Sequence, residues 1–347
     1  MEPAIEARGL TRTFQKRKER GWRAWIPGPR ETTTALRGVD LEVQRGELFG
    51  LLGPNAAGKT TLVKVLSTLL LPTSGEARVL GHDVAREADA VRRKVGVVLG
   101  GERALYWRLT ARENLWYFSQ LYDLPEALAK ERIDRLLGVV GLAERADERV
   151  ESYSKGMKQR LHIARGLLHE PEILLLDEPT IGLDPAAARA LRLLVRDLVD
   201  HHGRTVVLTT HYMYEADALS DRVAILSRGR IVACDTPRSL KGKFAQRAAW
   251  QVKVRAPGAG IPDSLRALPG VAHVAEQGEA GDGTLALRVL ARDGAGGELG
   301  AELAQAIAEQ KGRLVALARE EPTLEDVFVS LTGEGLGGRA DAEAGDG

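Results

Sequence analysis

The fold of this chain can be inferred first from the stretch Leu48-Phe-Gly-Leu-Leu-Gly53-Pro-Asn-Ala-Ala-Gly58-Lys59-Thr60-Thr61-Leu62. It fits the pattern G-x-x-x-x-G-K-[ST], follows an apolar run that predicts a strand, and precedes a helical pattern. Gly53 and Gly58 allow a tight turn whose backbone N–H groups point at phosphate oxygens, and a helix beginning near Lys59 adds its positive end. Lys59 can neutralise the β- and γ-phosphates, and the Thr60 hydroxyl can bind Mg²⁺. The alternative is a coincidental glycine-rich turn, but the flanking segments favour a nucleotide site.

A second segment, Ile173-Leu-Leu-Leu-Asp177-Glu178-Pro179, supplies acidic groups at the end of another predicted strand. The carboxyl ends of parallel strands meet at one edge of the sheet, so we expect Asp177 beside the phosphate loop, holding Mg²⁺ through water. Glu178 can orient or deprotonate an attacking water molecule. The other interpretation is an acidic helix N-terminus, which the helix dipole also favours.

Short apolar runs alternate with helical patterns from about Thr32 to Lys241, which predicts an α/β fold built on a largely parallel sheet. These runs carry few polar side chains, as expected for strands covered on both faces. The predicted core strands are Leu48–Leu52, Val95–Leu99, Ile173–Leu176 and Thr205–Thr209.

Composition excludes several classes of protein. The 347 residues include 49 Lys and Arg against 48 Asp and Glu, so nothing in the net charge of +1 favours nucleic acid. The single cysteine, Cys234, cannot form an internal disulfide. The N-terminus lacks a signal-peptide pattern, and no uncharged run approaches the roughly 20 residues of a spanning helix. We therefore expect a chain that does not cross a membrane.

Four further segments specify the class of phosphate-loop protein. They are Ser152-Tyr-Ser-Lys-Gly-Met157, Ile181-Gly-Leu-Asp184, the Thr-Thr-His211-Tyr segment, and Phe14 in Leu-Thr-Arg-Thr-Phe. With the two segments above, they resemble in order and spacing the ATP-binding subunits of ABC transporters. The resemblance covers residues 5 to 240 and implies an ABC-type nucleotide-binding domain with a helical subdomain at about 102–168.

The resemblance also implies roles for individual residues. Phe14 resembles the aromatic residue that stacks on adenine, and Ser154 with Gly156 resembles the signature segment that contacts the γ-phosphate bound by a partner subunit. Asp184 resembles the acid that links the two sites across the dimer, and His211 the switch histidine. The catalytic set is then Lys59, Glu178 and His211, and the metal set Thr60 and Asp177. The residues implied to contact ATP are Phe14, Gly53, Pro54, Asn55, Ala56, Ala57, Gly58, Lys59, Thr60, Thr61, Tyr153, Ser154, Lys155, Gly156, Met157 and Asp184.

The chain departs from the family pattern at three places. Ala56 occupies a position that is usually glycine, and Lys155 stands in a signature segment that usually reads Leu-Ser-Gly-Gly-Gln. The glutamine expected after the strand Val95–Leu99 is missing, and its position falls at Gly101 or Gly100. Either Glu102 or water takes its place, or coupling to the membrane partner works differently.

The pattern changes after residue 244. Alternating residues at Trp250–Val254 and Leu285–Val289, with helical spacing at Leu299–Ile307, predict the order β-α-β-β-α-β of a ferredoxin-like domain over 245–332. Its end, Glu321-Pro-Thr-Leu-Glu-Asp-Val-Phe328, resembles daunorubicin-resistance-type ATPases that serve ABC-2 exporters; a generic packing or dimerisation domain is the alternative. The glycine-rich, acidic tail 333–347 is expected to be disordered, and the basic segment 16–30 to form a surface loop.

Together these features predict an ATPase at the cytoplasmic face of the membrane that forms a homodimer through sandwiched ATP. Its expected partner is a separate ABC-2-type permease that exports a drug, lipid, polyketide or polysaccharide, and no nucleic acid is expected. Exposed aromatic residues around Tyr106–Arg108 and Trp116–Phe118 either receive the permease or belong to the core. The alternative functions are a soluble ABC-type nucleotide switch and a nucleic-acid- or ribosome-remodelling ATPase. A guanine-binding motif is absent.

Overall fold

The computed structural model forms two compact units, Met1–Cys234 and Asp235–Gly347. The boundary between the units therefore lies before the residue 244 that the sequence predicts. The reason is that helix α8 (Pro237–Lys243) packs against α11 (Leu324–Thr332) and so belongs to the second unit. Each unit is described by itself. The structure describes residues 2–17, 30–100, 105–243, 249–255, 260–280, 283–292 and 299–332.

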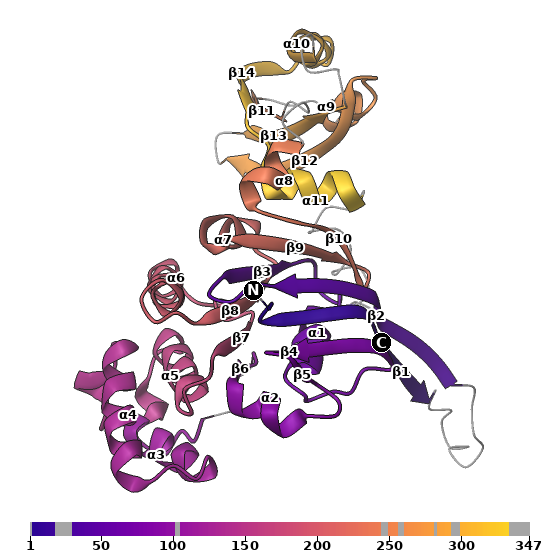
Figure 1. The fold of residues 1–347 in the computed structure, drawn as a ribbon. Helices are drawn as coiled ribbons and strands as arrows, with labels where there is room; N and C mark the ends of the chain where they lie inside the picture. The colour runs from indigo at the N-terminus through magenta and orange to yellow at the C-terminus, as the bar shows by residue number, and fades with distance from the viewer. Residues whose placement is uncertain are drawn as a thin grey trace, which may run out of the picture. The chain divides into compact units, whose positions relative to one another are not determined.

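A six-stranded sheet with the order β10-β9-β3-β8-β7-β6 forms the centre of the first unit (Figure 1). Strand β3 pairs in parallel with β8 and β9, and β7 with β6 and β8, so the prediction of a largely parallel sheet is confirmed. The strands are β3 (Leu48–Leu52), β6 (Val95–Val98), β7 (Ile173–Asp177), β8 (Thr205–Thr210), β9 (Arg222–Ser227) and β10 (Arg230–Asp235).

The two faces of this sheet bury separate cores. In β7, Leu174 and Leu176 pack in one core and Ile173 and Leu175 in the other, because successive side chains of a strand point to opposite faces. The first core contains side chains of α3, α4, α5 and α6, and the second contains side chains of α1. The helices are α1 (Lys59–Leu66), α2 (Ala88–Lys94), α3 (Ala111–Leu121), α4 (Glu126–Val139), α5 (Lys155–Leu167), α6 (Pro185–Asp200) and α7 (Met213–Leu219), with short 3₁₀ turns at Ala143–Arg145 and Val150–Ser152.

A second, antiparallel sheet with the order β2-β1-β4-β5 packs into the second core and was not predicted. Strands β1 and β2 pair as far as Arg17 and Arg30, so both ends of the predicted basic loop 16–30 are strand instead. The remaining residues of that segment, 18–29, lie outside the described part. The strands are β1 (Ile5–Arg17), β2 (Arg30–Val43), β4 (Ser74–Val79) and β5 (His82–Asp83).

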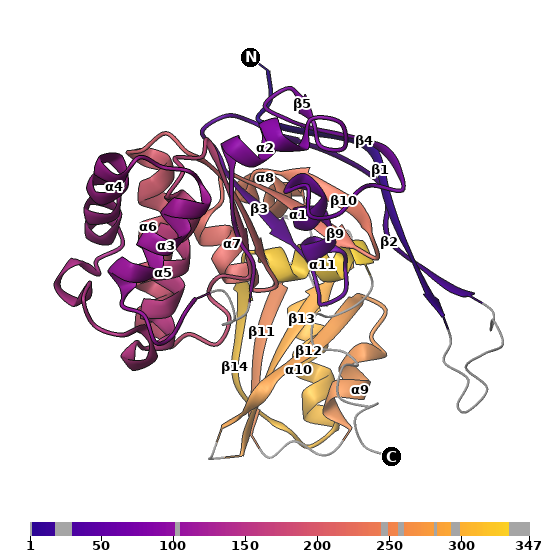
Figure 2. The ribbon, with the colours of Figure 1, turned by 90° about the horizontal axis from the view of Figure 1, so that it is seen from below.

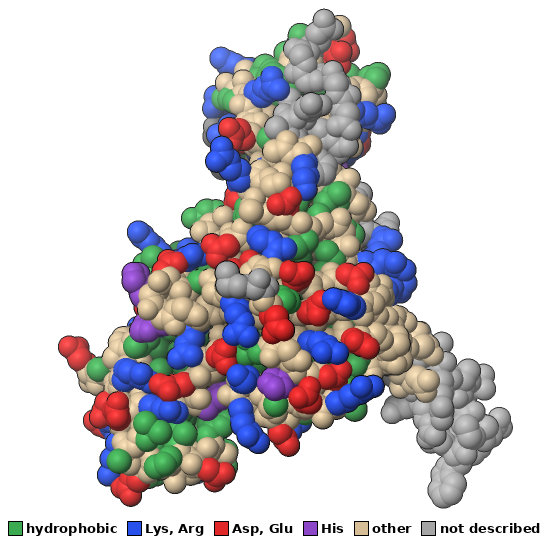
Figure 3. Space-filling model, in the orientation of Figure 1, with side chains coloured by type: hydrophobic (Ala, Val, Ile, Leu, Met, Phe, Trp, Pro, Cys, Tyr) green, Lys and Arg blue, Asp and Glu red, His purple; other side chains and the backbone are tan. Residues whose placement is uncertain are grey.

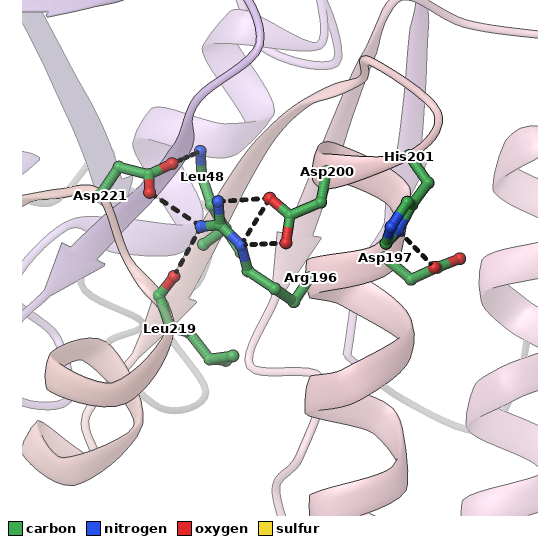
Figure 4. Close-up of polar contacts among 7 residues, drawn as sticks. All are labelled: Leu48, Arg196, Asp197, Asp200, His201, Leu219 and Asp221. Atoms are coloured by element: carbon green, nitrogen blue, oxygen red, sulfur yellow. Dashed lines mark hydrogen bonds and ion pairs between the residues drawn. The ribbon is translucent and has the colours of Figure 1, made fainter.

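Arg196 of α6 ties this helix to the base of β3 (Figure 4). Its guanidinium donates to both carboxylate oxygens of Asp200 and to Asp221 Oδ1 at 2.8 Å. The other oxygen of Asp221 accepts from Leu48 N, at the first residue of β3, also at 2.8 Å. These carboxylates raise the pKa of Arg196 above its ordinary value. The strand that leads to the phosphate loop is therefore anchored at its start.

The second unit contains a four-stranded antiparallel sheet with the order β12-β13-β11-β14, and α9 and α10 cover one of its faces (Figure 2). The element order β-α-β-β-α-β and this strand order are those of a ferredoxin-like fold, as predicted. The elements are β11 (Ala249–Arg255), α9 (Ile261–Arg266), β12 (Val271–Ala280), β13 (Thr284–Ala291), α10 (Leu299–Glu309) and β14 (Arg313–Glu320). The tail 333–347 lies outside the described residues.

Contacts within the second unit explain the residues of the run 321–328. Asp326 Oδ2 accepts from the backbone N–H and the hydroxyl of Thr323 at 2.7 and 2.9 Å, which fixes the start of α11. Arg288 of β13 donates to both oxygens of Asp326, at 2.9 Å from Nε and 2.8 Å from Nη2. The ion pair is buried and raises the pKa of Arg288. In the described residues of both units, every helix is too short or too polar to span a bilayer.

Candidate nucleotide site

The phosphate loop connects β3 to α1 at the carboxyl edge of the parallel sheet. A Cβ at Gly53 would lie 2.2 Å from the carbonyl oxygen of Leu226, so the close approach of β9 requires glycine there. Gly58 has φ +112° immediately before α1, a conformation that glycine adopts without strain. Within the loop, Asn55 and Ala56 are exposed and Ala57 is buried. The backbone of this loop is therefore fixed from both ends.

Ala56 adopts a left-handed conformation with φ 62°. The family pattern places glycine at this position, and the structure shows the physical reason. A Cβ in the left-handed region crowds the following carbonyl and costs about 1–2 kcal/mol. The loop keeps its shape with alanine, but under strain.

Lys59 is only 4% exposed, and its ammonium group contacts three oxygen atoms. Nζ donates to the carbonyl oxygens of Gly53 and Pro54 at 2.6 and 3.0 Å and lies 3.2 Å from Glu178 Oε1. A phosphate group offers charged oxygens in place of these neutral carbonyls, and charge-assisted hydrogen bonds are the stronger ones. The side chain is thus held in the loop, ready to bind an anion.

Asp177 lies at the end of β7 between two threonines. Thr60 Oγ1 donates to one carboxylate oxygen at 2.8 Å, and Thr209 Oγ1 of β8 donates to the other at 2.6 Å. Asp177 is 6% exposed, and hard oxygen ligands of this kind suit Mg²⁺. No group of three His, Cys, Asp or Glu residues with metal-binding geometry occurs in the described residues, so an ion here would need phosphate or water oxygens as well.

Thr209 was not identified from the sequence as a site residue. It lies inside an apolar run, where nothing distinguishes a hydroxyl that faces a carboxylate from one that packs in a core. Its backbone carbonyl and hydroxyl both accept from Glu178 N, at 3.1 and 3.0 Å. Thr209 therefore positions Asp177 and Glu178 together.

Glu178 and His211 face each other across the ends of β7 and β8. Glu178 Oε2 lies 3.3 Å from His211 Nδ1, although the two atoms are not aligned for a hydrogen bond. Glu178 has φ 48°, a strained conformation of the kind that concentrates at functional sites. The ring of Tyr212 packs against the imidazole with ring centres 4.1 Å apart. Lys59, Glu178 and His211 thus form one continuous polar cluster.

Phe14 lies on β1 and is 36% exposed. The Arg12 guanidinium covers one side of its ring at 4.7 Å from the ring centre, and Arg12 also donates to the carbonyl of Leu71 at 2.8 Å. Phe14 therefore belongs to the surface of the antiparallel sheet and not to the core.

The signature segment forms the N-terminus of α5. Ser154 caps the helix by accepting from Met157 N at 3.3 Å, and Tyr153 is buried, with its hydroxyl donating to the carbonyl of Arg145. A Cβ at Gly156 would lie 2.8 Å from the Cβ of Ala187, so glycine allows α5 to approach α6 closely. Lys155 extends over Gly182 of the loop that precedes α6. Asp184 caps α6 by accepting from Ala187 N at 2.9 Å.

The structure does not bring the signature segment to the phosphate loop of the same chain. Leu62 and Val63 of α1 pack in the core on one face of the sheet, whereas Leu161 and Ile163 of α5 pack on the opposite face (Figure 1). A nucleotide on Lys59 is therefore not enclosed by Ser154 of its own chain.

The loop that should carry the missing glutamine is only partly described. Gly101 and Glu102 lie outside the described residues. Gly100 is exposed, and a Cβ there would lie 3.6 Å from the carbonyl oxygen of Asp177. The position next to the end of β7, where Asp177 lies, is thus occupied by glycine backbone.

Comparison with known proteins places these features in a family. The family model described as ABC transporter matches residues 36–181. A daunorubicin resistance ATP-binding protein of Streptomyces coeruleorubidus is 43% identical over 310 residues, which cover 86% of this chain and 92% of that protein. A linearmycin resistance ATP-binding protein of Bacillus subtilis is 36% identical over 307 residues, 87% and 95% of the two chains.

A solved structure agrees with these relatives. A dimeric ATP-binding cassette in a post-hydrolysis state with bound ADP and Pi is 27% identical, with a TM-score of 0.57 over 67% of this chain and 98% of that chain. The phosphate loop, the two acids at the end of β7 and the histidine after β8 occur here in one polar cluster. The chain therefore belongs to the ABC transporter family, as one of its ATP-binding, ATP-hydrolysing subunits.

Proposed function

We propose that this chain powers export through a separate ABC-2-type permease by hydrolysing ATP between two of its copies at the cytoplasmic face of the membrane. The observation that supports the proposal is the polar cluster of Lys59, Asp177, Glu178 and His211 at one sheet edge. The relatives named above are resistance proteins, so the expected cargo is a drug-like amphipathic compound, with lipids, polyketides and polysaccharides as the other classes.

The proposed binding step uses the residues of the phosphate loop. Backbone N–H groups of 53–58 and the N-terminus of α1 hold the phosphates, and Lys59 exchanges its carbonyl partners for β- and γ-phosphate oxygens. Phe14 offers the open side of its ring to adenine. Thr60 and Asp177 would hold Mg²⁺, which supplies charge neutralisation for the phosphates when bound.

The proposed hydrolytic step uses Glu178 as the general base. Its carboxylate takes a proton from water, the water oxygen forms a bond to the γ-phosphorus, and the bond from that phosphorus to the bridging oxygen of ADP breaks. His211 holds the water and the γ-phosphate in line, and Lys59 stabilises the charge that develops on the equatorial oxygens. ADP carries the electron pair of the broken bond away.

The proposed homodimer follows from the placement of the signature segment. Because Ser154 lies on the opposite face of the sheet from α1, a second copy related by a two-fold axis is needed to present Ser154 and Gly156 to the γ-phosphate. Two ATP molecules are then enclosed at once, with Asp184 near the axis. Hydrolysis removes the γ-phosphate contacts and favours separation, which gives a two-state switch.

We propose that the aromatic surface around α3 receives the permease. Tyr106, Trp107 and Tyr117 are 47%, 47% and 40% exposed, and hydrophobic side chains gather over the region of α3 in Figure 3. In contrast, Trp116 and Phe118 pack against the core. Asn114 is fully buried and holds the backbone of Tyr106. Its side-chain amide accepts from Tyr106 N at 2.8 Å and donates to the Tyr106 carbonyl oxygen at 3.0 Å. An exposed surface of this kind suits a short helix of a partner.

The test of the proposed function is Glu178→Gln in purified protein. The variant should bind ATP, lose hydrolysis, and form a dimer in the presence of ATP and Mg²⁺, measured as a doubling of mass in solution. A variant that stays monomeric with ATP contradicts the sandwich. A wild-type protein that dimerises with ATP but turns none over would instead support the nucleotide-switch alternative. Co-purification with a polytopic membrane protein, reduced by Trp107→Ala, tests the permease surface.

A further inference from the structure

Thr180 and Glu215 form a buried hydrogen bond between the segments that follow Glu178 and His211, the proposed catalytic pair. Thr180 lies two residues after Glu178, and Glu215 lies on α7 four residues after His211. Thr180 Oγ1 donates to Glu215 Oε2 at 3.0 Å, and the two residues are 8% and 2% exposed. This bond joins the segment that follows the general base to the helix that follows the histidine.

The catalytic pair itself has no such direct bond. Glu178 Oε2 and His211 Nδ1 lie 3.3 Å apart without hydrogen-bond alignment. Glu178 also has φ 48°, so its direction depends on the segments that hold its backbone. On one side these are the bonds from Glu178 N to Thr209, and on the other side the chain that leads to Thr180.

Glu215 lowers the stability of the fold more than a residue with a purely structural role needs to. Its second oxygen, Oε1, is buried and accepts no hydrogen bond from any residue that the structure describes. A buried acceptor without a donor costs folding free energy, and an apolar pair of similar shape would avoid this cost. A directional bond at this place is therefore better explained by a positional requirement than by stability.

We infer that Glu215, acting through Thr180, is a positioning residue that sets the distance between Glu178 and His211 for activation of the attacking water. The inference rests on the proposed hydrolytic function. Misplacement of a general base by a fraction of an ångström slows the chemical step without weakening the contacts that bind the substrate. Loss of the Thr180–Glu215 bond should therefore lower kcat and leave the KM for ATP nearly unchanged.

The test compares Thr180→Val with Thr180→Ser. Valine removes the hydroxyl at nearly constant volume, whereas serine keeps the donor. We expect Thr180→Val to lower kcat about tenfold or more with less than about a twofold change in KM, and Thr180→Ser to stay within about twofold of wild type. Tyr214→Phe, on the same helix but 73% exposed, serves as the control without effect.

A second variant keeps the test decisive if Thr180→Val folds poorly. Glu215→Gln retains an acceptor for Thr180, and we expect its ATP binding to be unchanged and its kcat to lie between those of wild type and Thr180→Val. If Thr180→Val lowers the melting temperature while the kcat of folded protein stays at the wild-type value, or raises KM as much as it lowers kcat, the inference is wrong and the pair is structural. Wild-type protein that hydrolyses no ATP would overturn the proposed function itself, a result that is readily distinguished.

Discussion

Two ion pairs among the described residues, Lys59–Glu178 in the first unit and Arg288–Asp326 in the second, use similar groups differently. Lys59 is shared among two carbonyls and a carboxylate that also faces His211, so none of its contacts is a closed pair. Arg288 binds Asp326 through two nitrogens, and Asp326 is also held by Thr323. The first pair is arranged to be broken by a ligand, and the second to keep a helix in place.

The largest effect is expected from removing the cation of the first pair. Lys59→Ala should lower ATP turnover about a thousandfold or more, because a buried positive charge that stabilises the transition state is lost. Lys64→Ala, in the last turn of the same helix, should retain turnover and serves as the control. Phosphate release from purified protein at saturating ATP measures both. Full activity in Lys59→Ala would contradict the assignment of the site.

The second pair should contribute to stability and not to turnover. Arg288→Met leaves the Asp326 carboxylate buried without a cation, which should cost about 3–5 kcal/mol of unfolding free energy in the second unit. The matched control is Arg266→Ala, which removes an exposed pair with Asp263 in the same unit and should cost less than about 1 kcal/mol. Hydrogen exchange of residues 249–332 reports the change. Equal effects of the two variants would show that burial of Arg288 adds nothing.

His162 on α5 is a buried ionisable group that belongs to neither ion pair. Burial lowers its pKa from 6.5 to about 4, and its Nδ1 has no hydrogen-bond partner among the described residues. Between these two pKa values the unfolded chain binds a proton that the folded chain does not bind. The stability that comes from keeping His162 neutral is therefore complete above pH 6.5, and it is lost as the pH falls towards 4.

The predicted measurement is urea unfolding at two pH values. Wild type should lose about 2 kcal/mol more than His162→Gln between about pH 8 and about pH 5 because glutamine does not titrate. Parallel pH dependence of the two proteins would contradict this role of His162.

The sequence predicted the central sheet and singled out Lys59, Glu178 and His211, which the structure brings together, because these segments have strong local patterns. The strand predicted at Leu48–Leu52 has those bounds in the structure, and the phosphate loop follows a spacing that backbone chemistry imposes. The β-α-β-β-α-β order of the second unit was readable from alternation and helical spacing for the same reason.

Other features depend on contacts between distant residues and gave no local signal. The antiparallel sheet was missed because β1 is interrupted by irregularities between Ala7 and Thr13 that break its alternation. Buried polar residues such as Thr209, Asn114 and Glu215 resemble ordinary strand or helix residues until the structure shows what surrounds them. The roles of these residues follow from burial, which one sequence does not reveal.

The smallest expected effect concerns strain in the phosphate loop. Ala56→Gly relieves a left-handed conformation that costs about 1–2 kcal/mol, but glycine adds about 0.5–1 kcal/mol of unfolded-state entropy. The balance predicts a gain of roughly 0.5–1 kcal/mol in unfolding free energy. Ala57→Gly is the matched control, since this neighbour is buried and has no positive φ; it should only lose stability. If denaturant unfolding shows both variants destabilised alike, the loop is not strained at Ala56, and the tolerance of alanine at a glycine position needs another cause.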